Sequence, residues 1–159
     1  MIRFKERATL VLLTAGLILG HTSRAAETNN QPTPSENNNK PVATYRLGDK
    51  GPLGGKVYSI DDSGEHGLEA KTADEINTLS WNDAVTVASA YHSGWHLPTK
   101  TELKVLYDQR LVVGGFAKDD YWSGTELDSN SAWIQGFVNG DQDRYNKYSK
   151  LSVRAVRAF

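Results

Sequence analysis

Oxygen-bearing side chains gather in two polar segments of the sequence, each after a predicted strand. They are Glu126, Asp128, Asn130, Asn139, Asp141 and Asp143. Carboxylate and amide oxygens are the ligands that Ca²⁺ takes, and loops that converge at one end of a sheet could hold this ion. The run Asn139-Gly140-Asp141 is also typical of a tight hairpin turn, because Asn and Gly tolerate a positive φ. Neither segment has EF-hand spacing, so we expect turns and no cofactor, with calcium as the alternative.

Aromatic side chains close to these turns are candidates for stacking on sugar rings. A Trp can stack on a pyranose or anchor a hydrophobic core, and large aromatics belong to a core more often. Trp95 and Trp133 lie beside apolar strand residues and are expected in the core. Trp122 and Tyr145 are close to polar turns and are the candidates for exposed rings, with a structural role as the alternative that large aromatics favour. The predicted ligand-binding set is Trp122, Glu126, Asp128, Asn130, Asn139, Asp141, Tyr145 and Lys147.

Motifs for catalysis are few. The chain has no cysteine, which excludes disulfides, thiol nucleophiles and Cys-ligated zinc. It has no Gly-x-Ser-x-Gly elbow and no nucleotide-binding glycine loop. The histidines lack zinc-binding spacing, and His66 and His96 are interpreted as structural hydrogen-bonding groups. We expect a non-enzymatic protein and keep an unrecognised hydrolase as a less favoured hypothesis.

Two helices must position these segments. Ser80 is a predicted N-cap, and apolar residues with helical spacing follow it until Gly94 ends the helix. They are Trp81, Ala84, Val85, Ala88 and Tyr91. Thr99 and Glu102 form a capping box for a second helix, which buries Leu103, Leu106 and Tyr107 and ends near Arg110.

Strands are predicted on both sides of the helices. Lys56–Ile60 follows a glycine-rich turn and pairs with Gly67–Ala70 in a hairpin. Tyr121–Gly124, Ala132–Val138 and Leu151–Phe159 follow the helices, separated by Asp, Asn and Gly turns. This order predicts a single α+β domain over residues 42–159, with antiparallel sheets and two helices segregated from them.

Two arginines lie three residues apart in the last predicted strand. Arg154 and Arg157 should therefore face opposite sides, one of them paired with an acidic loop residue such as Glu126. Together with Lys147 and Lys150 they could form a local basic patch. Over the whole chain, 18 Lys+Arg nearly balance 19 Asp+Glu, so no nucleic-acid partner is expected.

The first 41 residues have the pattern of a signal peptide followed by a disordered linker. Residues 1–25 combine a basic start, a 13-residue apolar or small-residue run from Ala8 to Gly20 and a small-residue cleavage site, which predicts a cleaved signal peptide. Residues 26–41 are rich in Asn, Pro, Thr and Ser and predict a disordered linker. We therefore expect a secreted or periplasmic protein with no transmembrane segment after cleavage. The mature chain would carry 14 Lys+Arg and 18 Asp+Glu, a net charge of −4.

Several short motifs occur in order along residues 45–159 and together resemble the family of the Lcl C-terminal domain. They are Gly48-Asp49-Lys50-Gly51-Pro52, Gly64-Glu65-His66-Gly67-Leu68, Gly94-Trp95-His96-Leu97-Pro98-Thr99, Glu102-Leu103, Tyr121-Trp122-Ser123-Gly124-Thr125-Glu126, Ala132-Trp133 and Val153-Arg154-Ala155-Val156-Arg157. The resemblance implies a bacterial exported domain with a C-type-lectin-like fold, which formylglycine-generating enzymes share. Those enzymes use cysteine and copper, so the chain lacks the means for their oxidase chemistry.

The chain departs from this family in two ways. The named member carries its domain after a collagen-like stalk and binds sulfated glycosaminoglycans, whereas this chain has no Gly-X-Y repeat. An acidic mature chain is also poorly suited to binding polyanions.

The tripeptide Trp81-Asn82-Asp83 occurs in C-type lectin calcium sites. Here it follows the Ser80 cap and has no companion loop, so we interpret it as the first turn of a helix.

The sequence therefore predicts an exported, non-enzymatic binding domain that recognises a glycan or an envelope or host surface molecule in adhesion. The loops 122–130 and 139–147 would engage the ligand. The alternative is a structural or assembly component of the bacterial cell envelope that acts through a protein partner.

Overall fold

The computed structural model describes residues 41–159, so the predicted signal peptide and nearly all of the predicted linker lie outside the described residues. The elements are β1 (Lys56–Ile60), β2 (Gly67–Ala70), α1 (Trp81–Ala90), α2 (Lys100–Asp108), α3 (Arg110–Val113), β3 (Asp120–Glu126), β4 (Ser131–Gly136), β5 (Gln142–Asn146) and β6 (Val156–Ala158). They confirm a single small α+β domain. Within this part of the chain, no helix is long and apolar enough to cross a membrane.

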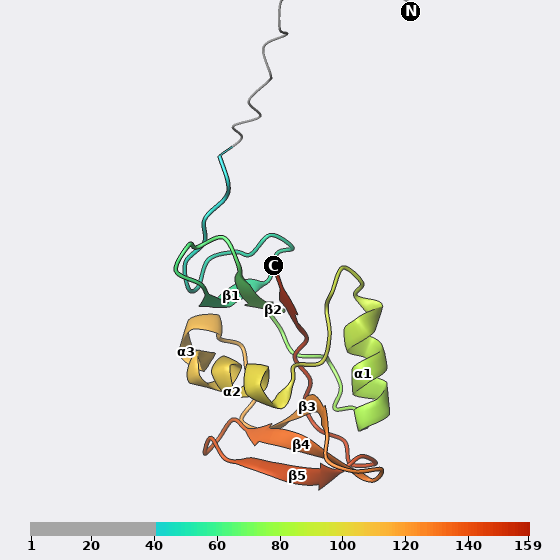
Figure 1. The fold of residues 1–159 in the computed structure, drawn as a ribbon. Coiled ribbons are helices and arrows are strands. Elements are labelled where there is room, and N and C mark those ends of the chain that lie inside the picture. The colour runs from blue at the N-terminus through green and yellow to red at the C-terminus, as the bar shows by residue number, and fades with distance from the viewer. Residues whose placement is uncertain (1–40) are drawn as a thin grey trace, which may run out of the picture. The chain divides into compact units, whose positions relative to one another are not determined.

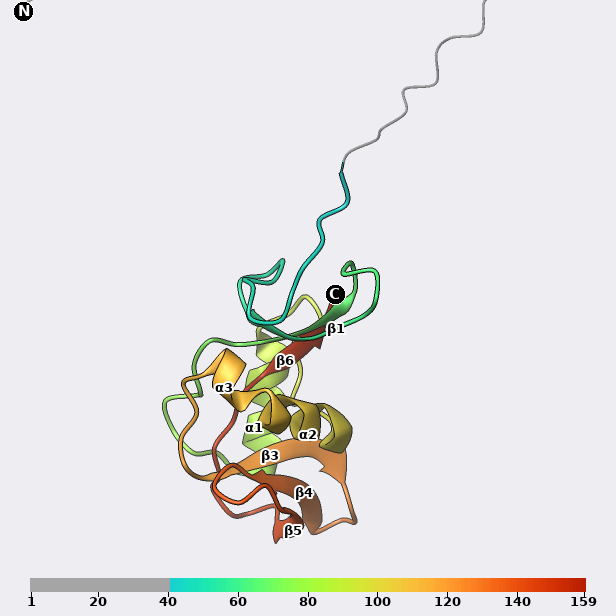
Figure 2. The same cartoon turned by 90° about the vertical axis from the view of Figure 1, so that its left-hand side faces the viewer.

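The strands form two antiparallel three-stranded sheets. The first has the order β1-β2-β6, so the last strand of the chain pairs with the first hairpin. The second has the order β3-β4-β5. Figure 1 shows the helices between the β1–β2 hairpin and the β3–β4–β5 sheet, and Figure 2 shows β6 reaching back toward β1. The helices thereby join two sheets that share no strand.

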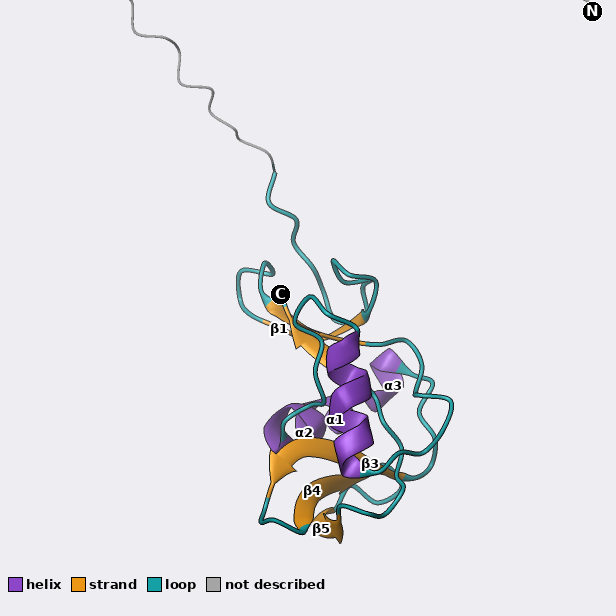
Figure 3. Cartoon of the chain, turned by 90° about the vertical axis from the view of Figure 1, so that its right-hand side faces the viewer, coloured by secondary structure: helices purple, strands orange, loops and turns teal. Residues whose placement is uncertain are grey.

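Helix α1 begins where the sequence predicts. The Ser80 hydroxyl accepts a hydrogen bond from the Asp83 backbone N–H at 3.4 Å and donates to the Asp83 carboxylate at 2.6 Å. These contacts confirm that Asp83 belongs to a cap. The helix buries Trp81, Ala84 and Ala88 against β3 and β4 (Figure 3).

Helix α2 carries the predicted capping box. The Thr99 backbone N–H donates to the Glu102 carboxylate at 2.8 Å, and the Glu102 N–H donates to the Thr99 hydroxyl at 3.2 Å. Leu103 and Leu106 are buried in a second apolar cluster with Tyr121 of β3. The short helix α3 follows directly, at the predicted end of α2.

The predicted strands need two corrections. Strand β5, Gln142–Asn146, lies in a segment where the sequence predicts turns. It is an edge strand with four of its five residues exposed, so it lacks the apolar alternation that marks a half-buried strand. Conversely, Leu151–Phe159 is a strand only over Val156–Ala158. Its buried middle lies against the irregular segment 71–79, with hydrogen bonds to Lys71, Glu75 and Leu79.

A buried guanidinium joins three irregular segments of the domain. Arg154 is 1% exposed and pairs with Asp74, with 2.7 Å between Nε and the carboxylate. It also donates to the carbonyls of Lys71 at 2.8 Å and Gly115 at 2.6 Å. The prediction that one of the two arginines pairs with an acidic loop residue is confirmed by Asp74. The named example, Glu126, is wrong, because Glu126 pairs with Lys147. Arg154 is likewise absent from any basic surface.

The second arginine of this pair sits beside another buried carboxylate. Glu69 is fully buried and accepts hydrogen bonds from the backbone N–H groups of Leu53 at 3.2 Å and Gly55 at 2.8 Å. Arg157 lies 3.7 Å from the same carboxylate. A Cβ at Gly55 would lie 2.6 Å from the Ala70 carbonyl oxygen. The glycine at this position therefore allows the turn to bring its backbone N–H donors close to Glu69.

His96 and Glu102 link the start of α2 to the loop before it. The His96 ring lies 3.1 Å from the Glu102 carboxylate and 2.9 Å from the Gly94 carbonyl oxygen. The hydrogen bond to Glu102 raises the pKa of His96, and the same bond lowers the pKa of Glu102 to about 2. This contact agrees with the structural role predicted for His96.

The Arg154–Asp74 pair leads to a prediction about stability. The substitution Asp74→Asn leaves a buried guanidinium without its counter-charge, and we expect it to lower the free energy of unfolding by about 3 kcal/mol. Urea denaturation measures this loss. The matched control is Asp108→Asn, which removes the exposed partner of Lys104 and should cost about 0.5 kcal/mol or less. A loss below about 1 kcal/mol for Asp74→Asn would show that the carbonyl hydrogen bonds alone hold Arg154.

The His96–Glu102 pair predicts a pH dependence. A raised histidine pKa contributes stability below the ordinary value of 6.5, lost as pH rises through the folded-state value. A lowered carboxyl pKa contributes stability above 4.5, lost as pH falls toward about 2. We expect His96→Gln to cost about 1 kcal/mol near pH 5.5 and clearly less near pH 9, measured by denaturation at both pH values. An equal cost at both would contradict the charged pair.

Candidate functional site

The turn between β3 and β4 is closed by its own hydrogen bonds. The Asp128 carboxylate accepts the backbone N–H groups of Asn130 and Ser131, both at 2.8 Å, and these bonds hold its pKa below the usual range. The Lys147 ammonium donates to the Glu126 carboxylate, to the Asp128 carbonyl at 2.8 Å and to the Ser129 carbonyl at 3.3 Å. Lys147 thus binds the Glu126 carboxylate, one of the side chains that the sequence offered to calcium.

Three other residues of the predicted set, Asn139, Asp141 and Tyr145, line a hollow at the far end of the same sheet. We call this the acidic hollow; its volume is about 180 Å³. It is lined by Asp120, Ile134, Gly136, Asn139, Asp141, Asp143 and Tyr145. The strand register explains the grouping, because Asp143 is paired with Ile134 and Asp120 with Gly136, and directly paired residues share a face of the sheet.

The polar turn at the rim of the acidic hollow has the local bonding of a tight turn. The Asn139 side chain donates to the Asp141 carboxylate at 2.6 Å and accepts the Asp141 backbone N–H at 3.2 Å. Gly140 has φ of +86° and packs against the Tyr107 ring, where a Cβ would lie 2.8 Å from ring atoms. This geometry fits the turn interpretation and fixes where Asp141 lies.

Charge is concentrated in the acidic hollow. Burial, and then the negative charges of Asp119 and Asp143, raises the pKa of Asp120 above its usual value. Tyr145 stands beside these carboxylates on edge strand β5, with 45% of its surface exposed. The site therefore combines an exposed aromatic ring with several hydrogen-bond acceptors. Among residues 41–159, no three Asp, Glu or His side chains are grouped so as to hold a metal ion.

Comparison with protein families matches residues 61–157 to the Lcl C-terminal domain. The chain belongs to this family. Comparison with curated proteins finds no match. Family membership accounts for the order of the motifs from Gly64 onward, while the ligand has to be argued from the site itself.

Trp122 of this Lcl domain is not a site residue. It is 0% exposed, packs with Trp81 and Ile134, and donates its indole N–H to the Leu79 carbonyl at 2.8 Å. Its selection as a candidate for an exposed, ligand-binding ring is wrong, because helices cover both faces of β3. Its neighbour Tyr121 therefore points into the other apolar cluster.

The remaining aromatic predictions divide. Trp95 is 5% exposed, as expected for a core residue, and Tyr145 is exposed as expected. Trp133 is half-buried, with the Lys100 ammonium 3.0 Å from the centre of its ring, so it lies at the edge of the core. Sequence reasoning missed Asp120, because an acidic residue at the start of a strand gives no signal until the register places it opposite Gly136.

The structure thus divides the predicted set into three parts. Glu126, Asp128, Asn130 and Lys147 form the closed turn, whereas Asn139, Asp141 and Tyr145 line the acidic hollow. Trp122 belongs to the core.

The charges in the acidic hollow lead to a prediction about pKa. In Asp143→Asn, Asp120 loses one of the negative charges that disfavour its ionised form, so its pKa should fall toward the usual value while burial keeps it above. Carboxyl ¹³C chemical shifts followed against pH measure this change. Asp108→Asn, which removes a carboxylate outside the hollow, is the control and should leave the Asp120 pKa unchanged. An unchanged pKa in Asp143→Asn would show that the two carboxylates do not sense each other.

Proposed function

We propose that this Lcl domain is an exported, non-enzymatic binding domain that recognises a glycan on an envelope or host surface, in an adhesive role. The observation that carries the proposal is the exposed Tyr145 beside the acidic hollow. The proposed location, secreted or periplasmic, rests on the signal-like residues 1–25.

The chemistry of the acidic hollow favours a sugar that carries no negative charge. An exposed tyrosine ring can stack on the apolar face of a pyranose. The carboxylates of Asp120, Asp141 and Asp143 can accept hydrogen bonds from sugar hydroxyls or from an amino group. The same carboxylates repel sulfate groups, so the site favours a neutral or amino sugar over a sulfated glycan. This distinguishes the chain from the named member of its family.

The size of the hollow points to a terminal sugar residue. Its volume of about 180 Å³ is below the roughly 300–1,000 Å³ of pockets that enclose drug-sized ligands. A sugar in such a site would remain partly in solvent, so we expect weak binding by one domain. Weak sites of this kind reach useful strength when several act together on one surface.

Replacement of Tyr145 tests the proposal. The purified protein is screened on a glycan array, and the affinity of the best neutral or amino-sugar hit is measured by calorimetry. We expect Tyr145→Ala to weaken that affinity about tenfold, because a stacking contact contributes on the order of 1 kcal/mol. Tyr148→Ala is the matched control, because Tyr148 is 83% exposed and does not line the hollow. Equal losses in both variants, or a hit confined to sulfated glycans, would count against this site.

Two added measurements separate the neighbouring hypotheses. Thermal melts with calcium and with EDTA should coincide, because the proposed site recognises sugar without a metal. Incubation with the best glycan, followed by mass spectrometry, should recover it intact. Release of a sugar that depends on Asp120 or Asp143 would instead support the hydrolase hypothesis, since paired carboxylates also serve as general acid and base.

The alternative role is an envelope component that acts through a protein partner. Large apolar side chains such as Ile76 and Leu111 are 98% and 88% exposed, which gives such a partner apolar surface to contact. A blank glycan array together with a specific partner, captured by cross-linking in envelope extracts, would favour this role over glycan recognition.

A further inference from the structure

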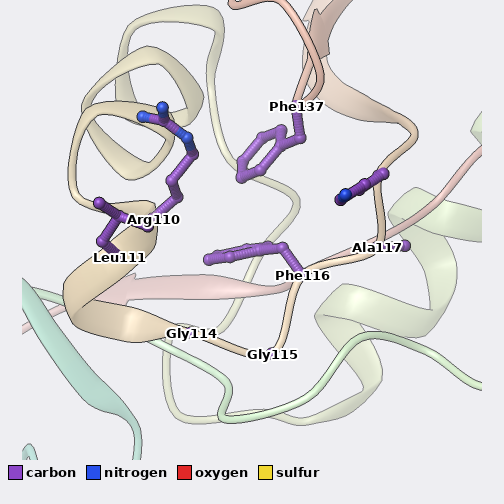
Figure 4. Close-up of a pocket in the computed structure, with 8 residues that line it drawn as sticks. Arg110, Leu111, Gly114, Gly115, Phe116, Ala117 and Phe137 are labelled. Atoms are coloured by element: carbon purple, nitrogen blue, oxygen red, sulfur yellow. The ribbon is translucent and has the colours of Figure 1, made fainter.

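A second hollow lies beside helix α3, on the other side of the turn that follows β4. We call it the phenylalanine hollow; its volume is about 310 Å³. It is lined by Arg110, Leu111, Gly114, Gly115, Phe116, Ala117, Lys118 and Phe137. Figure 4 shows the rings of Phe116 and Phe137 facing the Arg110 side chain across it. None of these residues belongs to the predicted ligand-binding set.

Packed aromatic rings form the wall of the phenylalanine hollow. The centres of the Phe116 and Phe137 rings are 4.6 Å apart, and Tyr121 lies 4.3 Å behind Phe137. The buried Arg154 guanidinium lies 4.0 Å from the centre of the Phe116 ring. Because these rings are held from behind by the core, the wall is formed before any ligand arrives, which lowers the entropic cost of binding.

Two cations complete the lining. Arg110 lies over the Tyr107 ring at 4.1 Å and donates one hydrogen bond to the Tyr107 carbonyl at 3.0 Å, which leaves most of its N–H groups unused. Lys118 is exposed. Within residues 41–159, neither cation forms an ion pair.

Two acidic side chains near this hollow in contacts or in sequence do not belong to its lining. Asp74 binds Arg154 and the Tyr121 hydroxyl, at 2.7 and 2.5 Å. Asp119, next to Lys118 in sequence, accepts the Ser152 hydroxyl at 3.0 Å. The residues that line the phenylalanine hollow thus carry two positive charges and no negative one, although the net charge of the whole chain is −1.

We propose that the phenylalanine hollow binds a small organic acid, a carboxylate joined to a flat aromatic body. The ring would pack on Phe116 and Phe137, and the carboxylate would pair with Arg110 and Lys118. The volume lies at the lower end of the range of small-molecule pockets, which suits a ligand of about one ring and its acid group. This site is separate from the acidic hollow, and its ligand carries a negative charge, which the acidic hollow disfavours.

An NMR titration of the ¹⁵N-labelled protein with benzoate tests the proposal, with benzamide as the neutral probe of the same shape. We expect benzoate to shift the backbone amide signals of Gly114, Gly115, Phe116 and Lys118, and to bind at least tenfold more tightly than benzamide. Raising the salt concentration should weaken benzoate binding and leave benzamide binding unchanged. Equal affinities for the two probes, or no shifts at these amides, would overturn the proposal.

Charge-removing variants locate the acid group. Lys118→Gln should weaken benzoate binding at least threefold, and Arg110→Gln more strongly, because a guanidinium can bind a carboxylate through two hydrogen bonds. Lys150→Gln removes another exposed lysine that does not line the hollow and should leave the affinity unchanged. Arg110 also contacts α2, so a thermal melt is used to check that Arg110→Gln is folded. If that variant is unfolded, Lys118→Gln alone tests the proposal. Equal binding by Lys118→Gln and Lys150→Gln would refute the assigned role of Lys118.

This test is independent of glycan recognition. Tyr145→Ala should leave benzoate binding unchanged, because Tyr145 lines the acidic hollow and not this one. Loss of benzoate binding in Tyr145→Ala would contradict the separation of the two sites.

Discussion

The buried guanidinium of Arg154 is the constraint on which the rest of this domain depends. A charge taken out of water is tolerated only with a counter-charge and satisfied hydrogen-bond donors. Asp74 supplies the charge, and the carbonyls of Lys71 and Gly115 accept hydrogen bonds. These acceptors come from irregular segments, of which 71–79 also has backbone hydrogen bonds to residues 151–155. Arg154 adds side-chain hydrogen bonds that link these segments to one another, and through Asp74 and Tyr121 it links them to the start of β3 as well.

This arrangement decides which surfaces remain for ligands. Strand β3 has Trp122 on one face against α1 and Tyr121 on the other against α2, so neither face is open. Strand β5 is paired only with β4 and is exposed for most of its length. Tyr145 stands on β5 and is therefore open to a ligand, unlike the aromatic rings of β3. The position of the acidic hollow follows from the packing of the helices.

The parts of the structure that the sequence predicted are those governed by local rules. Helices α1 and α2 begin directly after their predicted N-caps, Ser80 and Thr99, because capping depends on residues three apart in sequence. Strand β5 and the burial of Trp122 depend on how distant segments pack, and a polar edge strand has no periodicity to announce it. The partners of Arg154 are 80 residues away for Asp74 and 39 for Gly115, so no spacing rule connects them. The candidate site was predicted in part for the same reason. Its turn residues, Asn139 and Asp141, are recognised locally, whereas Asp120 joins the site only because the strand register pairs it with Gly136.

The charge at each hollow is set by the residues that internal pairing leaves over. Arg154, Arg157 and Lys147 all read as candidates for a basic patch, yet each lies against a carboxylate of its own chain and adds little field outside. Around the turn after β4, the charged side chains without an ion-pair partner within residues 41–159 are acidic in the acidic hollow and basic in the phenylalanine hollow. Net charge averages over both sides and describes neither. The charge of a ligand for such a domain is therefore predicted from the surface side chains that form no ion pair within the chain.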